Sequence, residues 1–131
     1  MKATSSSSAP VGESQDYVLP VDDEPDLAFH GRLIASVKSS PVATAEDYSR
    51  SEGRWMELSL YETQRGTIIA YEVKRSKIPG ERDRTRAEAF APKLHDDPDK
   101  TRQRVRIFFG QGWLAKKLYA KAGIENVLRV A

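Results

Sequence analysis

Two stretches of alternating side chains, joined by a short glycine-containing segment, constrain the fold of this chain more than any other feature. They cover residues 54–62 and 67–75. Alternation over that length is typical of β-strands with one buried face. The apolar faces consist of Met56, Leu58 and Leu60 in the first stretch and of Ile69, Tyr71 and Val73 in the second. The sequence therefore predicts an antiparallel hairpin.

The turn of this hairpin predicts its register. We interpret residues 63–66 as a four-residue loop in which Gly66 supplies the positive φ that the turn requires. Pairing Glu62 with Thr67 then places Leu60 opposite Ile69, Leu58 opposite Tyr71 and Met56 opposite Val73. We predict this register because a slip by one residue would carry one apolar face to the other side of the sheet.

Other strands are predicted on both sides of the hairpin. Residues 27–38 alternate in the same way and predict a strand before it. Residues 81–91 fit either a short charged helix or an edge strand, and Pro92 ends the element in both cases. Residues 126–131 are interpreted as a short last strand.

Two helices are predicted in the C-terminal part. Residues 98–109, with Asp97 as N-cap, favour a helix because one stripe holds Thr101, Val105, Phe108 and Phe109. A strand remains the alternative there. Residues 113–122 predict a second helix that ends at Gly123. The expected fold class is α+β, an antiparallel sheet of three to four strands around the hairpin, packed by the C-terminal helices.

The first 26 residues are predicted to be a disordered acidic tail, and residues 27–131 a single domain. The tail contains a serine tract, three prolines and no regular apolar period. Such a composition buries too little apolar surface to offset the entropy of ordering the chain. Its one apolar cluster is residues 17–19.

Charge changes sign along the chain. Residues 1–30 carry a net charge of −5, whereas residues 67–131 hold 15 basic and 8 acidic residues, a net charge of +7. Basic side chains that share a face bind phosphates without reading base sequence. The candidate nucleic-acid-binding residues form three groups: Lys74, Arg75, Lys77, Arg82, Arg84 and Arg86; Lys100, Arg102, Arg104 and Arg106; and Lys116, Lys117 and Lys121.

Several other chemistries find no support in the sequence. It has no cysteine, which excludes disulfides and thiolate sites, and no metal-binding spacing joins its two histidines, His30 and His95. Residues 110–115 match the G-x-G-x-x-A dinucleotide pattern, but no acidic residue follows at the distance that the ribose requires. We therefore expect no cofactor, no metal and no enzymatic activity. No apolar run approaches the roughly 18 residues of a membrane span, so we expect a cytoplasmic protein without membrane contact.

Three stretches carry a family resemblance: residues 54–63 (RWMELSLYET), 80–84 (GERDR) and 108–119 (FFGQGWLAKKLY). They resemble a group of small proteins found on proteobacterial plasmids and integrating elements, over roughly residues 27–124. The resemblance implies an accessory gene of a mobile genetic element, and it favours two consecutive helices near the C-terminus. It implies no activity and no site residue.

Charge and resemblance together predict a non-enzymatic accessory protein of a mobile genetic element, which contacts nucleic acid through its basic C-terminal half. The alternative is a protein-interaction or inhibitor module that acts on a host or plasmid protein, with the acidic tail or residues 39–53 engaging the partner. The sequence leaves open whether the three basic groups lie on one face.

Overall fold

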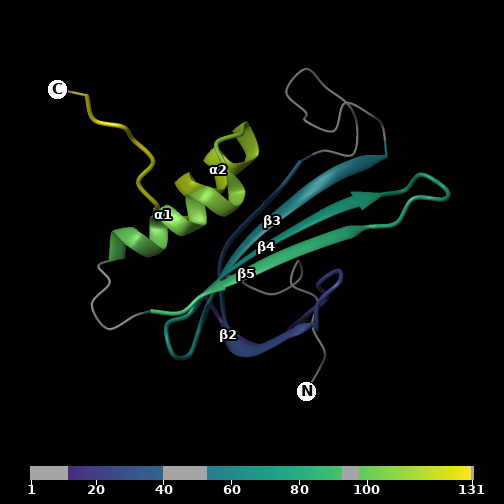
Figure 1. Ribbon diagram of the computed structural model, residues 1–131, viewed down its shortest axis with the longest axis horizontal. Helices are drawn as coiled ribbons and strands as arrows, with labels where there is room; N and C mark the ends of the chain where they lie inside the picture. The colour runs from purple at the N-terminus through teal and green to yellow at the C-terminus, as the bar shows by residue number, and fades with distance from the viewer. Residues whose placement is uncertain (1–11, 40–52, 93–97, 131) are drawn as a thin grey trace.

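A computed structural model describes residues 12–39, 53–92 and 98–130. This part of the chain forms five antiparallel strands followed by two helices (Figure 1). The elements are β1 (Ser14–Leu19), β2 (Leu27–Lys38), β3 (Arg54–Thr63), β4 (Ile68–Ser76), β5 (Arg84–Phe90), α1 (Pro98–Phe109) and α2 (Trp113–Ala122). The strands pair in sequence order. The α+β class is confirmed, but the sheet has five strands where three to four were predicted.

The additional strand is β1, which lies inside the predicted disordered tail. It pairs with β2, and Tyr17 stands opposite Phe29. Tyr17 and Leu19 are each 1% exposed, and the ring of Tyr17 lies 4.8 Å from that of Tyr61. Disorder is therefore the wrong prediction for residues 14–19, because β2 supplies the hydrogen bonds and the burial that this segment lacks alone. Residues 1–11 lie outside the described part.

The central hairpin forms, but in a register one residue away from the predicted one. The loop has three residues, 64–66, because the N–H of Thr63 donates to the carbonyl of Thr67 (2.8 Å). Gly66 has φ +89°, as a three-residue hairpin loop requires. The register therefore pairs Leu60 with Ala70, Leu58 with Glu72 and Met56 with Lys74, and places Ile69, Tyr71 and Val73 opposite Tyr61, Ser59 and Glu57. The two apolar faces of the hairpin consequently point to opposite sides of the sheet.

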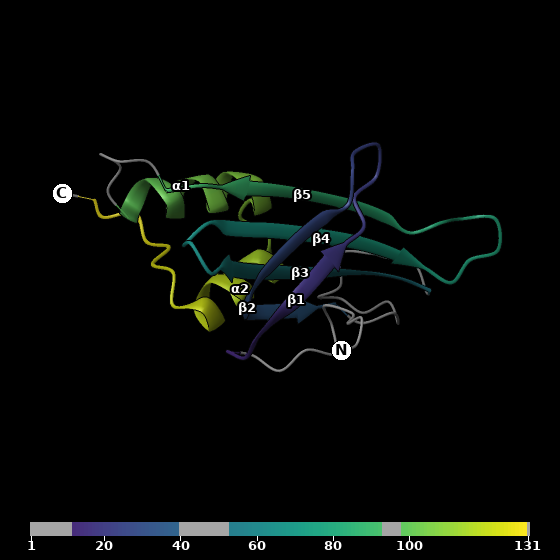
Figure 2. The ribbon, with the colours of Figure 1, turned by 90° about the horizontal axis from the view of Figure 1, so that it is seen from below.

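This register is stable because both sides of the sheet are covered. On the helix side, the two helices pack on Ala35, Leu58, Leu60, Ala70 and Phe90 through Val105, Phe108, Leu114, Ala115, Leu118 and Tyr119. On the other side, which we call the inner side, the β1–β2 hairpin folds back over β3 and β4 and buries Tyr17, Leu19, Val21, Leu33, Tyr61, Ile69, Tyr71 and Val73. Figure 2 shows β1 and β2 crossing the other strands obliquely.

The sheet curls where β2 changes partners along its length. The pairing of β2 with β3 shifts by one residue between Leu33 and Ala35, so Leu33 packs on the inner side and Ala35 on the helix side. Just before this bulge, β2 passes so close to β3 that a Cβ on Gly31 would lie 2.3 Å from the carbonyl oxygen of Glu62. The bulge and the glycine together let the strand bend.

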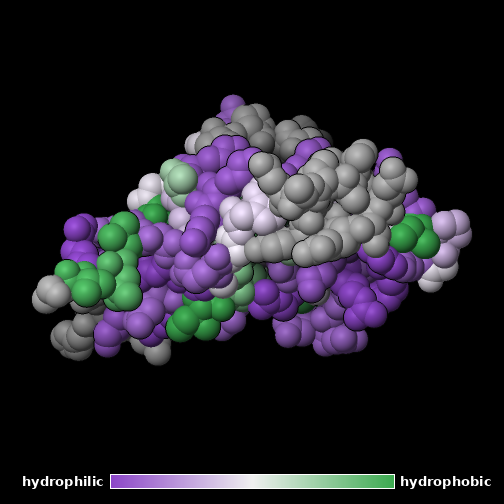
Figure 3. Space-filling view, turned by 90° about the horizontal axis from the view of Figure 1, so that it is seen from above, coloured by the Kyte–Doolittle hydropathy of each residue, from purple (hydrophilic) through white to green (hydrophobic). Residues whose placement is uncertain are grey.

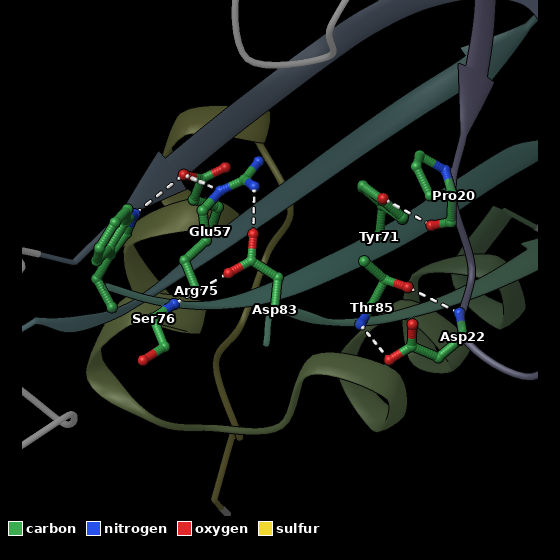
Figure 4. A network of polar contacts seen from close by, with 9 residues as sticks. Pro20, Asp22, Glu57, Tyr71, Arg75, Ser76, Asp83 and Thr85 are labelled. Carbon is green, nitrogen blue, oxygen red and sulfur yellow. Dashed lines mark hydrogen bonds and ion pairs between the residues drawn. The ribbon is translucent and has the colours of Figure 1, made fainter. Parts of the chain in front are cut away.

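A pair of reciprocal hydrogen bonds closes the curl. The N–H of Asp22, in the β1–β2 connection, donates to Oγ1 of Thr85 (2.8 Å), and the N–H of Thr85 donates to Oδ2 of Asp22 (3.1 Å). The hydroxyl of Tyr71 donates to the carbonyl of Pro20 (2.7 Å), as Figure 4 shows. These bonds attach the β1–β2 connection to the outer edge of β5.

The C-terminal predictions mostly agree with the structure. Residues 98–109 are helical, with Val105 and Phe108 buried and Ile107 76% exposed, and α2 ends at Gly123 in the left-handed conformation (φ 73°). Of the two interpretations of residues 81–91, the edge strand is confirmed as β5. The predicted last strand is wrong for residues 126–130, which have no regular structure. The predicted N-cap Asp97 lies outside the described residues. No helix in the described part has the length and apolarity needed to span a membrane.

We predict that Gly31→Ala destabilises the fold by about 3 kcal/mol or more, because the new methyl group meets backbone atoms that cannot move aside. Chemical denaturation monitored by circular dichroism measures the change. Gly80→Asn serves as control, since Gly80 has open space around it and asparagine tolerates positive φ. A stability loss no larger than that of the control would contradict this account of the curl.

Candidate anion-binding surface

One end of the sheet extends beyond the helices. The start of β3, the end of β4, the start of β5 and the β4–β5 connection form this extension (Figure 1), which we call the finger. The helices contact other parts of the strands, where the helix-side core lies. In the part of the chain that the structure describes, no helix covers the helix-side face of the finger, which we call its open face.

The open face of the finger is mainly cationic. Strand alternation places on it Arg54, Met56, Lys74, Ser76 and Arg84. Together with the β4–β5 connection, these residues line a hollow of about 690 Å³, which also includes Glu81 and Arg82. The hollow thus holds an excess of positive charge over negative charge.

Lys74 and Arg84 are the central cations of this face. They stand directly opposite each other on β4 and β5, and both are exposed. Neither forms an ion pair with a carboxylate among the described residues. Like charges directly opposite each other on antiparallel strands destabilise a sheet. An anion bound between the two cations would relieve that repulsion.

Acidic side chains border the cationic pair on one side. A second hollow, of about 400 Å³ beside β5, is lined by Lys74 and Arg84 and also by Asp22, Asp23 and Glu24 of the β1–β2 connection. Asp22 is engaged with Thr85, and these backbone and hydroxyl bonds lower its pKa. The acidic connection therefore limits the cationic surface at its β5 edge.

Glu81 neutralises one cation at the rim of the hollow. Arg54 donates from Nε to its Oε1 (3.0 Å) and from Nη2 to its Oε2, and the hydroxyl of Ser76 donates to Oε1 (2.7 Å). These bonds lower the pKa of Glu81 to about 2 and raise the pKa of Arg54. Arg54 is thus paired and is less available for a ligand than Lys74 and Arg84.

Arg75 follows Lys74 in the chain, but its side chain lies on the inner side of the sheet and has a structural role. It donates to Glu57 (2.8 Å) and Asp83 (3.0 Å), and the bond to Glu57 is the main cause of its raised pKa. Trp55 also donates to Glu57 (3.0 Å), and Asp83 accepts from the N–H of Ser76 (3.0 Å). Figure 4 shows this network across β3, β4 and the β4–β5 connection. Arg75 therefore holds the finger together.

The other members of the first basic group are distributed around the finger. Arg86 donates to Glu72 (2.9 Å) and to the carbonyl of Phe108 (2.9 Å), and its guanidinium lies 3.9 Å from the ring centroid of Phe108, which ties β5 to α1. Arg82 reaches Asp22 (3.4 Å), and Lys77 lies 5.8 Å from the ring of Trp55.

The second and third basic groups lie on the helices. On α1, Arg102 pairs with Asp99 (3.0 Å) and Arg106 donates to the carbonyl of Glu125 (2.9 Å); Lys100 and Arg104 lie on the same helix. On α2, Lys121 donates to the carbonyl of Ser36 (3.0 Å), Lys117 lies 5.5 Å from the ring of Trp113, and Lys116 is exposed. Several of these cations thus have partners inside the protein.

Two basic residues on these surfaces, Arg54 and Lys38, were not among the candidates that the sequence predicted. Arg54 belongs to the finger face, and its place follows from the same alternation that identified β3. Lys38, from β2, lines a hollow of about 460 Å³ together with Lys117 and Lys121. Only the docking of α2 beside β2 brings those three lysines together, so no local pattern identifies them.

The described residues hold no group of metal-ligating side chains. His30 lies 2.9 Å from Asp16 on the exposed surface, and His95 is outside the described part. The glycine pattern of residues 110–115 follows a helix instead of a strand, so it lacks the strand–turn–helix context of a dinucleotide site.

No family model, no curated protein and no solved structure matches this chain.

The pKa of Glu81 provides a test of the rim geometry. Because the folded-state pKa of about 2 lies below the ordinary 4.5, the contribution of this carboxylate to stability is complete above pH 4.5 and is lost as the pH falls toward 2. We expect the NMR signal of the Glu81 carboxyl carbon to titrate near pH 2. In Arg54→Gln it should titrate at a higher pH. A native midpoint near 4.5 would show that the pair with Arg54 does not form.

Substitutions of the adjacent cations Lys74 and Arg75 should differ in their effect on the free energy of unfolding. Arg75→Ala is expected to cost about 1–3 kcal/mol, because the carboxylate of Glu57, with its side chain 15% exposed, loses its charged donor. Lys74→Ala should change the free energy of unfolding by less than about 0.5 kcal/mol. Urea denaturation of both variants measures the difference. Equal costs would mean that Lys74 has a structural partner as well.

Proposed function

We propose that the protein binds nucleic acid through its phosphates, and that the open face of the finger makes the contact. The single observation that carries this proposal is the opposed pair Lys74 and Arg84, two exposed cations without a carboxylate partner in the described part of the chain. The resemblance described above suggests the setting, an accessory protein of a mobile genetic element.

The chemistry of the pair suits a phosphodiester. The Arg84 guanidinium offers a planar fork that matches two phosphate oxygens, whereas Lys74 offers a compact point charge. Two residues that stand opposite each other and exchange backbone hydrogen bonds have Cα atoms about 5.5 Å apart. At that spacing, the side chains of Lys74 and Arg84 can contact one phosphate or two successive phosphates. Arg82, with its side chain 70% exposed, extends the cationic surface along the β4–β5 connection.

The same surface offers little for reading base sequence. Most side chains that line it are charged; Met56 and Trp55 line it as well, and the indole N–H of Trp55 is engaged with Glu57. Phosphate contacts position a protein on nucleic acid and carry no sequence information. We therefore propose sequence-independent binding, with an affinity that falls as salt releases the phosphate contacts.

The double variant Lys74→Ala/Arg84→Ala tests the proposal. Each lost phosphate contact reduces the slope of log affinity against log salt by about 1, so the double variant should lower the slope by about 2 and weaken binding at low salt. The fold should be retained or slightly stabilised, because the repulsion between the two cations is removed. Fluorescence anisotropy with labelled duplex and single-stranded DNA and RNA, at several salt concentrations, measures both quantities.

A matched control removes the same charge elsewhere. Arg65→Ala/Lys116→Ala deletes two exposed cations, one in the β3–β4 turn at the far end of the hairpin and one on α2. It should bind nearly as the unmodified protein does. Asp23→Asn/Glu24→Gln should strengthen binding, because these acids border the pair. Absence of binding at low salt, or equal losses in both double alanine variants, would refute the proposed surface.

A further inference from the structure

Residues 124–130 expose an unusual amount of apolar surface. They follow α2 without regular secondary structure, and Val127, Leu128 and Val130 are 66%, 87% and 85% exposed. Figure 3 shows the apolar patch at this end of the molecule. Contiguous exposed apolar side chains mark interaction sites in soluble proteins. Two of the three are valines, which favour β-strands.

The outer edge of β5 offers a place for an added strand. The N–H of Thr85 points away from β4, because it donates to Asp22. Strand alternation then directs the N–H and C=O groups of Ala87 and Ala89 outward as well. No backbone hydrogen bond is formed by either of them on that side within the described part of the chain. The β1–β2 connection thus covers only the first residues of this edge.

An apolar groove adjoins this open edge. A hollow of about 460 Å³ lies between β5 and α1, and Ala89, Phe90, Ile107 and Phe108 line it together with the charged Glu88 and Arg104. Ile107 is 76% exposed. An edge with free backbone groups beside an apolar groove is the arrangement that accepts an extended peptide strand.

The exposed segment and this groove lie on different sides of α1. Arg106 and Asp99 face a hollow shared with residues 124–129, and the carbonyl of Glu125 accepts from Arg106. The groove lies beside Arg104, and at 100° per residue positions 104 and 106 are about 200° apart around α1. In addition, the side-chain amides of Gln111 and Asn126 pair with each other (2.9 and 3.0 Å). α1 therefore stands between segment and groove.

We propose that two copies of this chain associate by exchange of residues 127–130, each adding them as a strand to the outer edge of β5 in the other copy. Each copy carries one donor segment and one acceptor edge, so a two-fold symmetric dimer satisfies both. Leu128 and Val130, which alternation places on the same face of the added strand, enter the groove between β5 and α1. This proposal is independent of nucleic-acid binding.

Two variants, one on each side of the contact, test the exchange. Leu128→Asp damages the donor segment, and Ile107→Lys damages the acceptor groove; both side chains are so exposed that the fold should be retained. We expect the unmodified full chain to be a dimer by sedimentation equilibrium, and each variant to dissociate about tenfold or more readily. Thermal unfolding of the variants at low protein concentration provides the control for the fold.

Mixing the two variants distinguishes strand exchange from other contacts. Leu128→Asp retains an intact acceptor and Ile107→Lys an intact donor, so the mixture should form a heterodimer through one exchanged strand. Ala89→Pro, which removes an outward N–H without removing a bond to β4, should behave as Ile107→Lys does. A monomeric unmodified chain at the highest accessible concentration overturns the proposal. So does a dimer that both variants leave intact, or a mixture that forms no heterodimer.

Discussion

The two central strands of this sheet are apolar on both faces, and the rest of the structure depends on that constraint. Leu58, Leu60 and Ala70 point to the helix side, whereas Tyr61 and Tyr71 point to the inner side. Each of these two apolar faces is exposed to water unless another layer of structure covers it. The helices form one layer. The other is the sheet's own first hairpin, folded back over β3 and β4 and held at β5 by the reciprocal bonds between Asp22 and Thr85.

That solution leaves two places incompletely covered. The helices end before the finger does, so the helix-side face of the finger is lined by side chains that tolerate water, chiefly Lys74 and Arg84. The β1–β2 connection reaches only the start of β5, so no described residue pairs with the remainder of that edge. The first gap carries an excess of positive charge, which suits a polyanion. The second has free backbone groups and an apolar groove, which suits a strand. The two proposals therefore concern two different surfaces, the helix-side face of the finger and the edge of β5, that the same packing leaves incompletely covered.

Sequence patterns predicted the individual strands and helices much better than the register and pairing between the strands. β2, the hairpin, α1 and α2 were predicted nearly as the structure has them, because each has a local period that its own burial imposes. The register of the hairpin was wrong because the prediction assumed one buried face, whereas the inner side of the sheet is buried too. β1 was missed because its apolar residues, Tyr17 and Leu19, stand among serines, prolines and acids, and become a strand only against β2.

For the basic residues, the sequence identified where positive charge is concentrated but not which side chains are exposed and which have partners inside the protein. Lys74, Arg75 and Arg86 are near neighbours in the chain, yet Arg75 supports the finger from the inner side, Arg86 joins β5 to α1, and Lys74 remains exposed. The sequence by itself determined which segments become strands and helices, since hydrophobic period and turn residues act locally. The tertiary structure decided which faces are buried, which cations find partners and which strand edge stays open, because these depend on contacts between segments that are far apart in the chain.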